Sequence, residues 1–149
     1  MDSGLVEAIF VTPEHSALPA PVDRVRAYAG RGLEGNRYLF EQAEPGKALT
    51  LIAAEALERL EAEQGIALSA AASRRNVLTR GIDVNALVGR RFTIGEVECV
   101  GVELCEPCSD LERLTVPGVM KGLVHQAGLN ADILNDGEIA VGDPVVAVD

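Results

Sequence analysis

The sequence predicts a mainly β protein: a small β-barrel with one clear amphipathic helix and one or two short helices. Short apolar runs of alternating polarity recur along most of the 149 residues, and glycine, proline, asparagine or aspartate separates them. Residues 53–64 are the one stretch with a sustained helical period. Many short strands at regular spacing around a single good helix are typical of a small barrel.

The composition fits one globular domain spanning residues 1–149. Apolar residues make up 48% of the chain and charged residues 24%, so a sizeable core can be buried. No apolar run approaches the roughly 20 residues of a membrane span. The N-terminus lacks the basic and apolar regions of a secretory signal. We therefore expect a cytoplasmic protein that does not enter a membrane.

The first half of the chain predicts three strands and the helix. Strands are expected over residues 5–11, 22–28 and 48–52. The glycine-rich loop over residues 30–37 lacks the spacing and the Lys-Ser/Thr ending of a phosphate-binding loop, so it predicts no nucleotide site. In the helix, Leu57 and Leu60 lie on the apolar side, and Gly65 fits the position just after a helix end.

The second half of the chain is mostly β in its pattern. Strands are expected over residues 76–79, 91–94, 97–105, 129–134, 138–141 and 145–148, with a turn at 95–96 and a hairpin turn at 135–137. Residues 107–114 and 117–125 predict one or two short helices.

The strand over residues 97–105 changes its apolar phase. Val97 and Cys99 share one face, whereas Val102 and Leu104 have the opposite parity. One extra residue at Gly101 would restore a single apolar face, which predicts a β-bulge there.

The charge of the chain limits its partners. A net charge of −10 argues against a nucleic-acid surface and against an anionic membrane surface. Arginines nevertheless gather in loops, and a guanidinium binds phosphate oxygens bidentately. Arg74, Arg75 and Asn76 precede a strand, and Arg37 ends the glycine loop. We interpret these four as candidate anion-binding residues; the alternatives are solvated arginines and an asparagine that organises its own turn.

Cys105 and Cys108 enclose Glu106 and Pro107. Two thiols at this spacing can form a disulfide, share a soft metal or carry a transferable sulfur atom, each through the thiolate. A passive pair beside a turn is the alternative. The third cysteine, Cys99, is expected in the core. The odd cysteine count argues against a secreted disulfide framework, and one pair with only two histidines does not complete a structural zinc site.

Five motifs stand in a characteristic order: residues 32–38 (GLEGNRY), 74–77 (RRNV), 85–89 (NALVG), 104–108 (LCEPC) and 137–143 (GEIAVGD). In this order they resemble the MOSC domain, named after the C-terminal domain of molybdenum cofactor sulfurases. The resemblance covers nearly the whole chain. It implies a MOSC-type β-barrel and a reactive cysteine that either carries sulfur as a persulfide or ligates molybdenum.

The resemblance also implies roles for individual residues. Cys108, after Pro107, matches the family's cysteine and is the implied sulfur carrier or molybdenum ligand, with Cys105 as its assistant. Arg74 and Asn76 fall on an Arg-x-Asn motif that helps molybdenum-binding relatives hold the pterin phosphate of molybdopterin. Arg75, Arg37 and Lys121 are expected to border the same site, and Lys121 would share a helix face with His125 beside the cysteine segment.

Three departures from the family pattern shape the expected partners. Asn36 stands where the family usually has aspartate. The 149 residues include neither the additional N-terminal barrel of relatives that reduce N-hydroxylated compounds nor the pyridoxal-phosphate desulfurase domain of the large sulfurases. We therefore expect sulfur, and the pyridoxal phosphate chemistry that releases it, to come from a separate cysteine desulfurase-type partner. The expected acceptor is the molybdenum cofactor or a molybdoenzyme.

Other functions stay open at the level of sequence. A metal-free thiol oxidoreductase is disfavoured because the cysteine pair does not lie between a strand and a long helix. A non-enzymatic module that binds an anion or cofactor would keep the barrel and the arginines and use the cysteines only for packing. Whether the chain is a sulfur-transfer protein or a molybdenum-cofactor-dependent reductase is also undecided.

Overall fold

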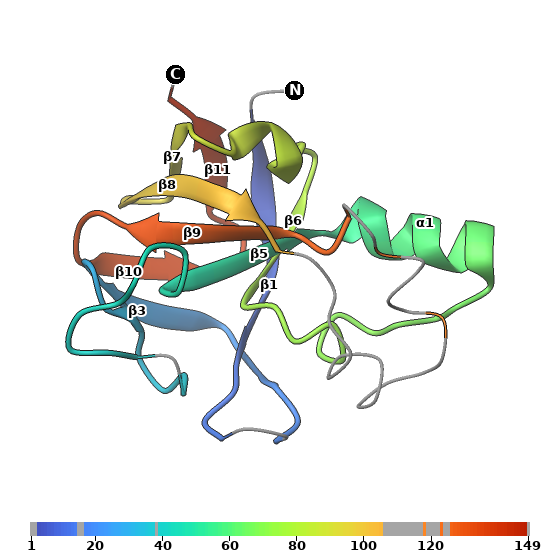
Figure 1. Ribbon diagram of the computed structural model, residues 1–149, viewed down its shortest axis with the longest axis horizontal. Coiled ribbons are helices and arrows are strands. Elements are labelled where there is room, and N and C mark those ends of the chain that lie inside the picture. The colour runs from blue at the N-terminus through green and yellow to red at the C-terminus, as the bar shows by residue number, and fades with distance from the viewer. Residues whose placement is uncertain are drawn as a thin grey trace.

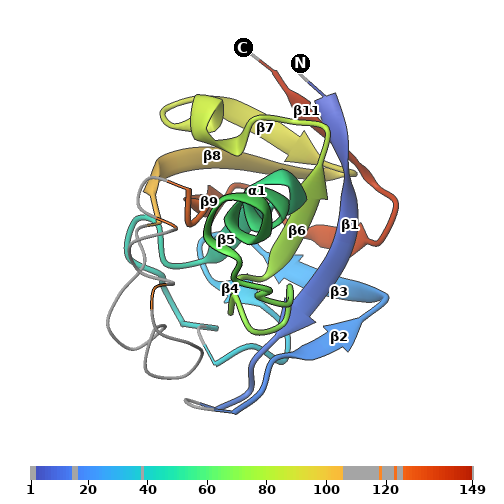
Figure 2. The ribbon, with the colours of Figure 1, turned by 90° about the vertical axis from the view of Figure 1, so that its right-hand side faces the viewer.

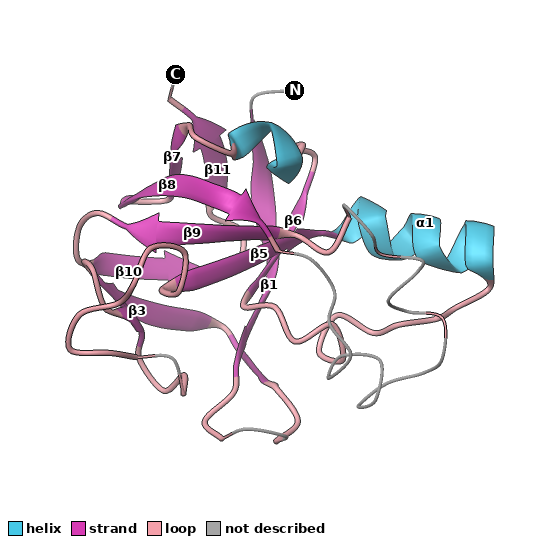
Figure 3. Ribbon diagram, viewed as in Figure 1, coloured by secondary structure: helices cyan, strands magenta, loops and turns pink. Residues whose placement is uncertain are grey.

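The computed structural model describes residues 3–14, 17–37, 39–105, 118, 123 and 126–148. The predicted mainly β architecture is confirmed (Figure 3). The strands are β1 (Ser3–Val11), β2 (Ala20–Val22), β3 (Arg24–Tyr28), β4 (Gly32–Leu33), β5 (Leu49–Ala53), β6 (Val77–Arg80), β7 (Arg91–Ile94), β8 (Val97–Leu104), β9 (Leu129–Ile133), β10 (Gly137–Ala140) and β11 (Pro144–Ala147). The helices are α1 (Ala54–Gln64) and the short 3-10 helix η1 (Val84–Leu87).

Seven strands form a closed barrel in the order β11-β7-β8-β9-β5-β6-β1, and the ring closes because β11 pairs with β1 (Figure 1). The strand β2 extends this sheet beyond β1. Neighbours pair antiparallel except β5 and β6, which run parallel. Parallel neighbours need a crossover connection, and α1 with the residues that follow it supplies one.

The bulge predicted at Gly101 is confirmed. The register between β8 and β9 shifts between Gly101 and Glu103. Gly101 also lies against η1, where an added Cβ would come within 2.0 Å of the Leu87 carbonyl oxygen. A side chain does not fit at this bulge, which explains the glycine.

The predicted hairpin at residues 135–137 is wrong. β10 pairs with β3 and belongs to a separate sheet of order β10-β3-β4, whereas β9 pairs with β5 and β8. Polar side chains redirect the chain here. Asn135 Oδ1 accepts from the Glu98 N–H at 2.7 Å, and Asp136 Oδ1 accepts from the Ala29 N–H at 2.7 Å. The chain is therefore tied to the beginning of β8 and to the residue after β3 as it passes from one sheet to the other.

Two smaller differences concern element boundaries. The single strand expected over residues 22–28 is two strands, because β2 pairs with β1 and β3 pairs with β10. The helix η1 was not predicted from its pattern; Asp83 caps it by accepting from the Asn85 N–H at 3.1 Å. The short helices expected over 107–114 and 117–125 fall almost entirely outside the described residues.

The helix α1 extends away from the barrel strands (Figure 1), and Figure 2 shows it end-on. It is the longest helix of the described residues, as predicted, and ends where Gly65 adopts a left-handed conformation, with φ 68°. Leu60 is 2% exposed and packs with Leu68, Leu123 and Ala127. This second cluster, outside the barrel core, holds the crossover and the segment before β9 against the helix.

Candidate functional site

The turn before β6 carries the candidate arginines. It is closed by hydrogen bonds from the Ser73 N–H to the Ser69 and Ala70 carbonyls and from the Arg74 N–H to the Ala71 carbonyl. Arg74 has a φ of 64° and is the one non-glycine residue with a positive φ in the described part of the chain. A left-handed conformation costs a residue with a Cβ roughly 1–2 kcal/mol. A glycine would avoid this cost, so the arginine stands at a position whose backbone conformation favours glycine.

Asn76 organises the backbone around this turn. Its side chain is buried at 8% exposure. Asn76 Oδ1 accepts from both the N–H and the hydroxyl of Thr50 at 3.1 Å, and Nδ2 donates to the Phe10 carbonyl at 3.2 Å. The side chain thus joins the beginning of β6 to β1 and β5. These three bonds join separate strands; they lie outside the residue's own turn, so the role of Asn76 in ligand binding stays a prediction.

Arg75 connects the turn to the segment before β9. Its Nε donates to the Ala127 carbonyl at 2.8 Å. The next carbonyl, that of Gly128, accepts from the Cys105 N–H at 2.8 Å. One arginine and one cysteine of the predicted site are therefore held by consecutive peptide groups. The bond from Nε uses one of the five N–H donors of the guanidinium.

The glycine loop is attached to the end of β1. Asn36 is buried at 8% exposure, and its Oδ1 accepts from the Thr12 N–H at 2.9 Å. The Arg37 N–H donates to the Thr12 carbonyl at 2.8 Å. Thr12 lies two residues beyond Phe10, to which Asn76 is bonded. Arg37 and Asn76 are therefore anchored to the same end of β1.

The three cysteines lie in different settings. Cys99 is fully buried, and burial, assisted by the neighbouring Glu98 carboxylate, raises the pKa of its thiol to about 12. It therefore belongs to the core, as predicted. Cys105 is half-buried and directly follows β8. Cys108, Lys121 and His125 lie outside the described residues.

Gly128 is a structural residue that the sequence pattern did not single out. Its φ is 110°, and an added Cβ would lie 2.0 Å from the Leu51 carbonyl oxygen. The close approach lets the Gly128 carbonyl face Cys105 while the chain enters β9. A glycine immediately before an apolar strand was the available signal.

Three residues of the candidate site have side chains of the types that bind an anion or a soft metal. Arg74 and Arg75 offer guanidinium groups, which match phosphate oxygens, and Cys105 offers a soft sulfur ligand. The Arg75 side chain and the Cys105 backbone N–H donate to the carbonyls of two consecutive residues, Ala127 and Gly128. Hydrogen bonds thus connect the three segments. The glycine loop and the arginine turn are both bonded to the end of β1, and the arginine turn and the cysteine segment are both bonded to the residues just before β9.

The comparisons with known proteins agree with this architecture. The sequence model of the MOSC domain matches residues 40–146. The chain belongs to the MOSC domain family. No curated protein matches the chain. The MOSC match begins after the glycine loop, so Arg37 lies before the matched range.

Solved structures show the same fold. The YuaD protein from Bacillus subtilis is 13% identical with a TM-score of 0.79, and the alignment covers 96% of this chain and 94% of that protein. YiiM from Geobacillus stearothermophilus is 19% identical with a TM-score of 0.76, covering 98% of this chain and 75% of that one. YiiM from Escherichia coli is 18% identical with a TM-score of 0.70, covering 97% and 70%. This protein therefore has the fold of these solved structures, and the MOSC family to which it belongs is linked to molybdenum cofactor chemistry.

None of the helices in the described ranges is long and apolar enough to span a membrane.

Proposed function

We propose that this MOSC protein handles the molybdenum cofactor or its sulfur, with Cys108 as the reactive thiol and Cys105 as its assistant. The observation that carries the proposal is the pairing of Arg75 and Cys105 with the consecutive carbonyls of Ala127 and Gly128. This pairing ties the arginine turn to Cys105, the first cysteine of the motif. An arginine close to a thiol favours the thiolate, the form that ligates metal and attacks sulfur.

Arg74 and Arg75 are the proposed phosphate-binding residues. The strained backbone of Arg74 supports this role, because strain of this kind is kept where the side chain is needed. Arg37 and Lys121 complete the proposed basic border, while Asn76 positions the turn through its bonds to Thr50 and Phe10. When the molybdenum cofactor is bound, it supplies the redox chemistry. The chain's own residues would hold its phosphate and provide a thiolate ligand.

The sulfur-carrier form of the proposal is a balanced exchange. The Cys108 thiolate attacks the outer sulfur of a persulfide on a cysteine desulfurase-type donor; a new S–S bond forms on Cys108, and the donor cysteine leaves as a thiolate. The Cys105 thiolate can then attack the Cys108 sulfur, forming a disulfide and releasing hydrosulfide. A dithiol reductant restores the two thiols. A cytoplasmic location, where such reductants are present, is part of this proposal.

The test is the cofactor and sulfur content of the purified protein. The protein is produced in a host that makes the molybdenum cofactor, and molybdenum and pterin are measured per chain. A second sample is incubated with a cysteine desulfurase and sulfur-labelled cysteine, and persulfides are located by mass spectrometry. Cys108→Ser and Arg74→Ala are the test variants, and Cys99→Ala is the control because that thiol is buried.

Either of two results supports the proposal. Molybdenum and pterin at near one per chain, lost in Cys108→Ser and reduced in Arg74→Ala, would make Cys108 a metal ligand. A persulfide on Cys108 without molybdenum would make it a sulfur carrier. Wild-type protein that carries neither molybdenum nor a persulfide would contradict the proposal and leave an anion-binding module or a metal-free thiol protein.

A further inference from the structure

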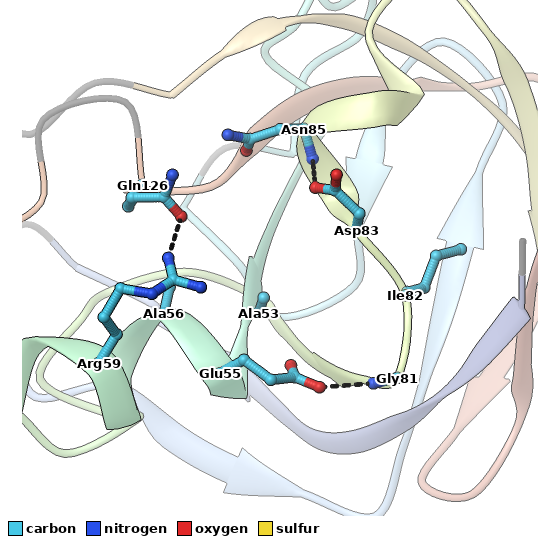
Figure 4. A pocket seen from close by; sticks show the side chains of 9 residues that line it. All are labelled: Ala53, Glu55, Ala56, Arg59, Gly81, Ile82, Asp83, Asn85 and Gln126. Carbon is cyan, nitrogen blue, oxygen red and sulfur yellow. Dashed lines mark hydrogen bonds between the residues drawn. The ribbon is translucent and has the colours of Figure 1, made fainter. Parts of the chain in front are cut away.

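A separate hollow opens beside the first half of α1, with a volume of about 410 Å³ (Figure 4). This volume is in the range of small-molecule sites, about 300–1,000 Å³. The described residues that line it come from the end of β5, from α1, from the connection between β6 and η1, from η1 itself and from the segment before β9. They are Ala53, Glu55, Ala56, Arg59, Gly81, Ile82, Asp83, Asn85 and Gln126.

Charged groups of both signs border the hollow. Glu55 is fixed by one oxygen, which accepts from the Gly81 N–H at 2.8 Å. Arg59 reaches across from the helix, and its Nη1 donates to Gln126 Oε1 at 3.0 Å. Asp83 is exposed and uses one oxygen to cap η1. Figure 4 shows Arg59 and Asp83 on opposite sides of the hollow, with Glu55 below them.

The charge balance separates this hollow from the proposed cofactor site. Two carboxylates face one guanidinium, so a phosphate or another multiply charged anion would be repelled. None of the residues predicted for the cofactor site is among the described residues that line it. Ala53, Ala56 and Ile82 add an apolar wall suited to a short hydrocarbon chain.

Glu55 gives a further indication of the ligand's charge. Its second oxygen, Oε1, is shielded from solvent and has no hydrogen-bond partner within the described residues. A carboxylate oxygen in this state has lost hydration without compensation. A cation in the adjoining hollow would offset this loss through its charge without a direct bond to Oε1.

We propose that this hollow binds a free α-amino acid with a neutral or basic side chain. The ligand's ammonium group lies beside Glu55 and Asp83, and its carboxylate lies beside Arg59. The ammonium and the carboxylate on the α-carbon of such a ligand match the two signs of charge, and the excess of acidic groups disfavours aspartate and glutamate. Arg59 can donate to this carboxylate, because its bond to Gln126 uses one of the five N–H donors of the guanidinium.

The experiment measures dissociation constants by isothermal titration calorimetry of the full chain with a small panel of compounds. L-Lysine and L-alanine carry both ligand groups, Nα-acetyl-L-lysine lacks the α-ammonium charge, 1,5-diaminopentane lacks the carboxylate, and L-glutamate adds a negative charge. L-Lysine is expected to bind most tightly. Each of the last three compounds is expected to bind at least about tenfold more weakly than L-lysine, as the loss of one charge-assisted contact predicts.

Variants separate this site from general charge effects. Glu55→Gln keeps an oxygen that can accept from the Gly81 N–H, so the fold is preserved while the charge is lost. It is expected to weaken L-lysine binding severalfold, because the attraction between the Glu55 charge and the ligand's ammonium group is lost. Arg59→Gln is expected to abolish the preference for L-lysine over 1,5-diaminopentane. Glu63→Gln, on the same helix but outside the hollow, is the control and leaves binding unchanged.

Two results would overturn the inference. One is the absence of binding by every compound at millimolar concentration. The other is equal binding of L-lysine to the wild type and to Glu55→Gln. Cys108→Ser is expected to bind L-lysine like the wild type, so failure of the cofactor proposal leaves this result unaffected.

Discussion

Replacing Arg74 separates the cost of its backbone conformation from the contribution of its side chain. Arg74→Ala and Arg74→Gly both remove the guanidinium, and with it every interaction that the guanidinium makes. They differ at the backbone, where the φ of 64° favours glycine. The difference between the two variants therefore reports on the backbone at position 74 and not on the arginine side chain.

The magnitude follows from two opposing effects. An alanine in the left-handed conformation costs about 1–2 kcal/mol. A glycine avoids that cost but loses about 0.5–1 kcal/mol more conformational entropy on folding. Arg74→Gly is therefore expected to be more stable than Arg74→Ala by about 0.5–1 kcal/mol. Both variants are expected to lose phosphate or cofactor binding to the same extent.

The assay pairs urea unfolding with molybdenum and pterin content. Unfolding midpoints and slopes give the free-energy difference between the variants. Greater stability of Arg74→Ala would refute the left-handed conformation of residue 74. Full cofactor content in both variants would refute the role of the guanidinium, even if the stability difference were found.

Three further predictions concern stability. Leu60→Ala is expected to lower the free energy of unfolding by about 2–5 kcal/mol, because Leu60 is 2% exposed; a loss under about 1 kcal/mol in urea titration would contradict the packing of α1. Gly128→Ala is expected to lower the free energy of unfolding by about 2–4 kcal/mol, because the added Cβ would lie 2.0 Å from a carbonyl oxygen. Gly142→Ala is the control: its φ is 93° and the added Cβ would meet nothing within 4 Å, so it measures the backbone contribution alone. An equal loss in the two variants would contradict the tight contact at Gly128. Burial raises the pKa of the Cys99 thiol to about 12, so the folded state holds this proton more strongly than the unfolded chain does. The resulting contribution to stability is present below the ordinary pKa of a thiol and is lost as the pH rises toward 12. A Cys99→Ala variant whose stability falls with alkaline pH in the same way as that of the wild type would contradict this.

The parts of the fold that the sequence predicted depend on local patterns. Alternation of apolar residues predicted most of the barrel strands, and the parity change at Gly101 predicted the bulge because a face mismatch has one simple repair. The hairpin at 135–137 was wrong because an asparagine-aspartate-glycine turn signal is local. The partners of Asn135 and Asp136 are the distant backbone groups of Glu98 and Ala29.

The candidate site was predictable by residue type and less so by geometry. Motifs identified Arg75 and Cys105 separately, but only the folded chain shows that Ala127 and Gly128 lie between them. The strain at Arg74 is likewise invisible in the sequence, since it arises from the closed turn before β6. The roles of Cys108 and Lys121 stay predictions, because both residues lie outside the described part of the chain.

The most direct test of the central claim is the pH dependence of Cys108 alkylation, followed over time by mass spectrometry. The claim is that the arginine turn and the cysteine segment form one site, so the positive charge of Arg75 should favour the Cys108 thiolate. Cys108 is expected to label first, Cys105 more slowly, and Cys99 only on unfolding. In Arg75→Gln the midpoint of Cys108 labelling should shift to higher pH, while Arg24→Gln, whose arginine pairs with Glu138 elsewhere, should leave it unchanged. Faster labelling of Cys105 than of Cys108, or an identical Cys108 profile in Arg75→Gln, would contradict the account.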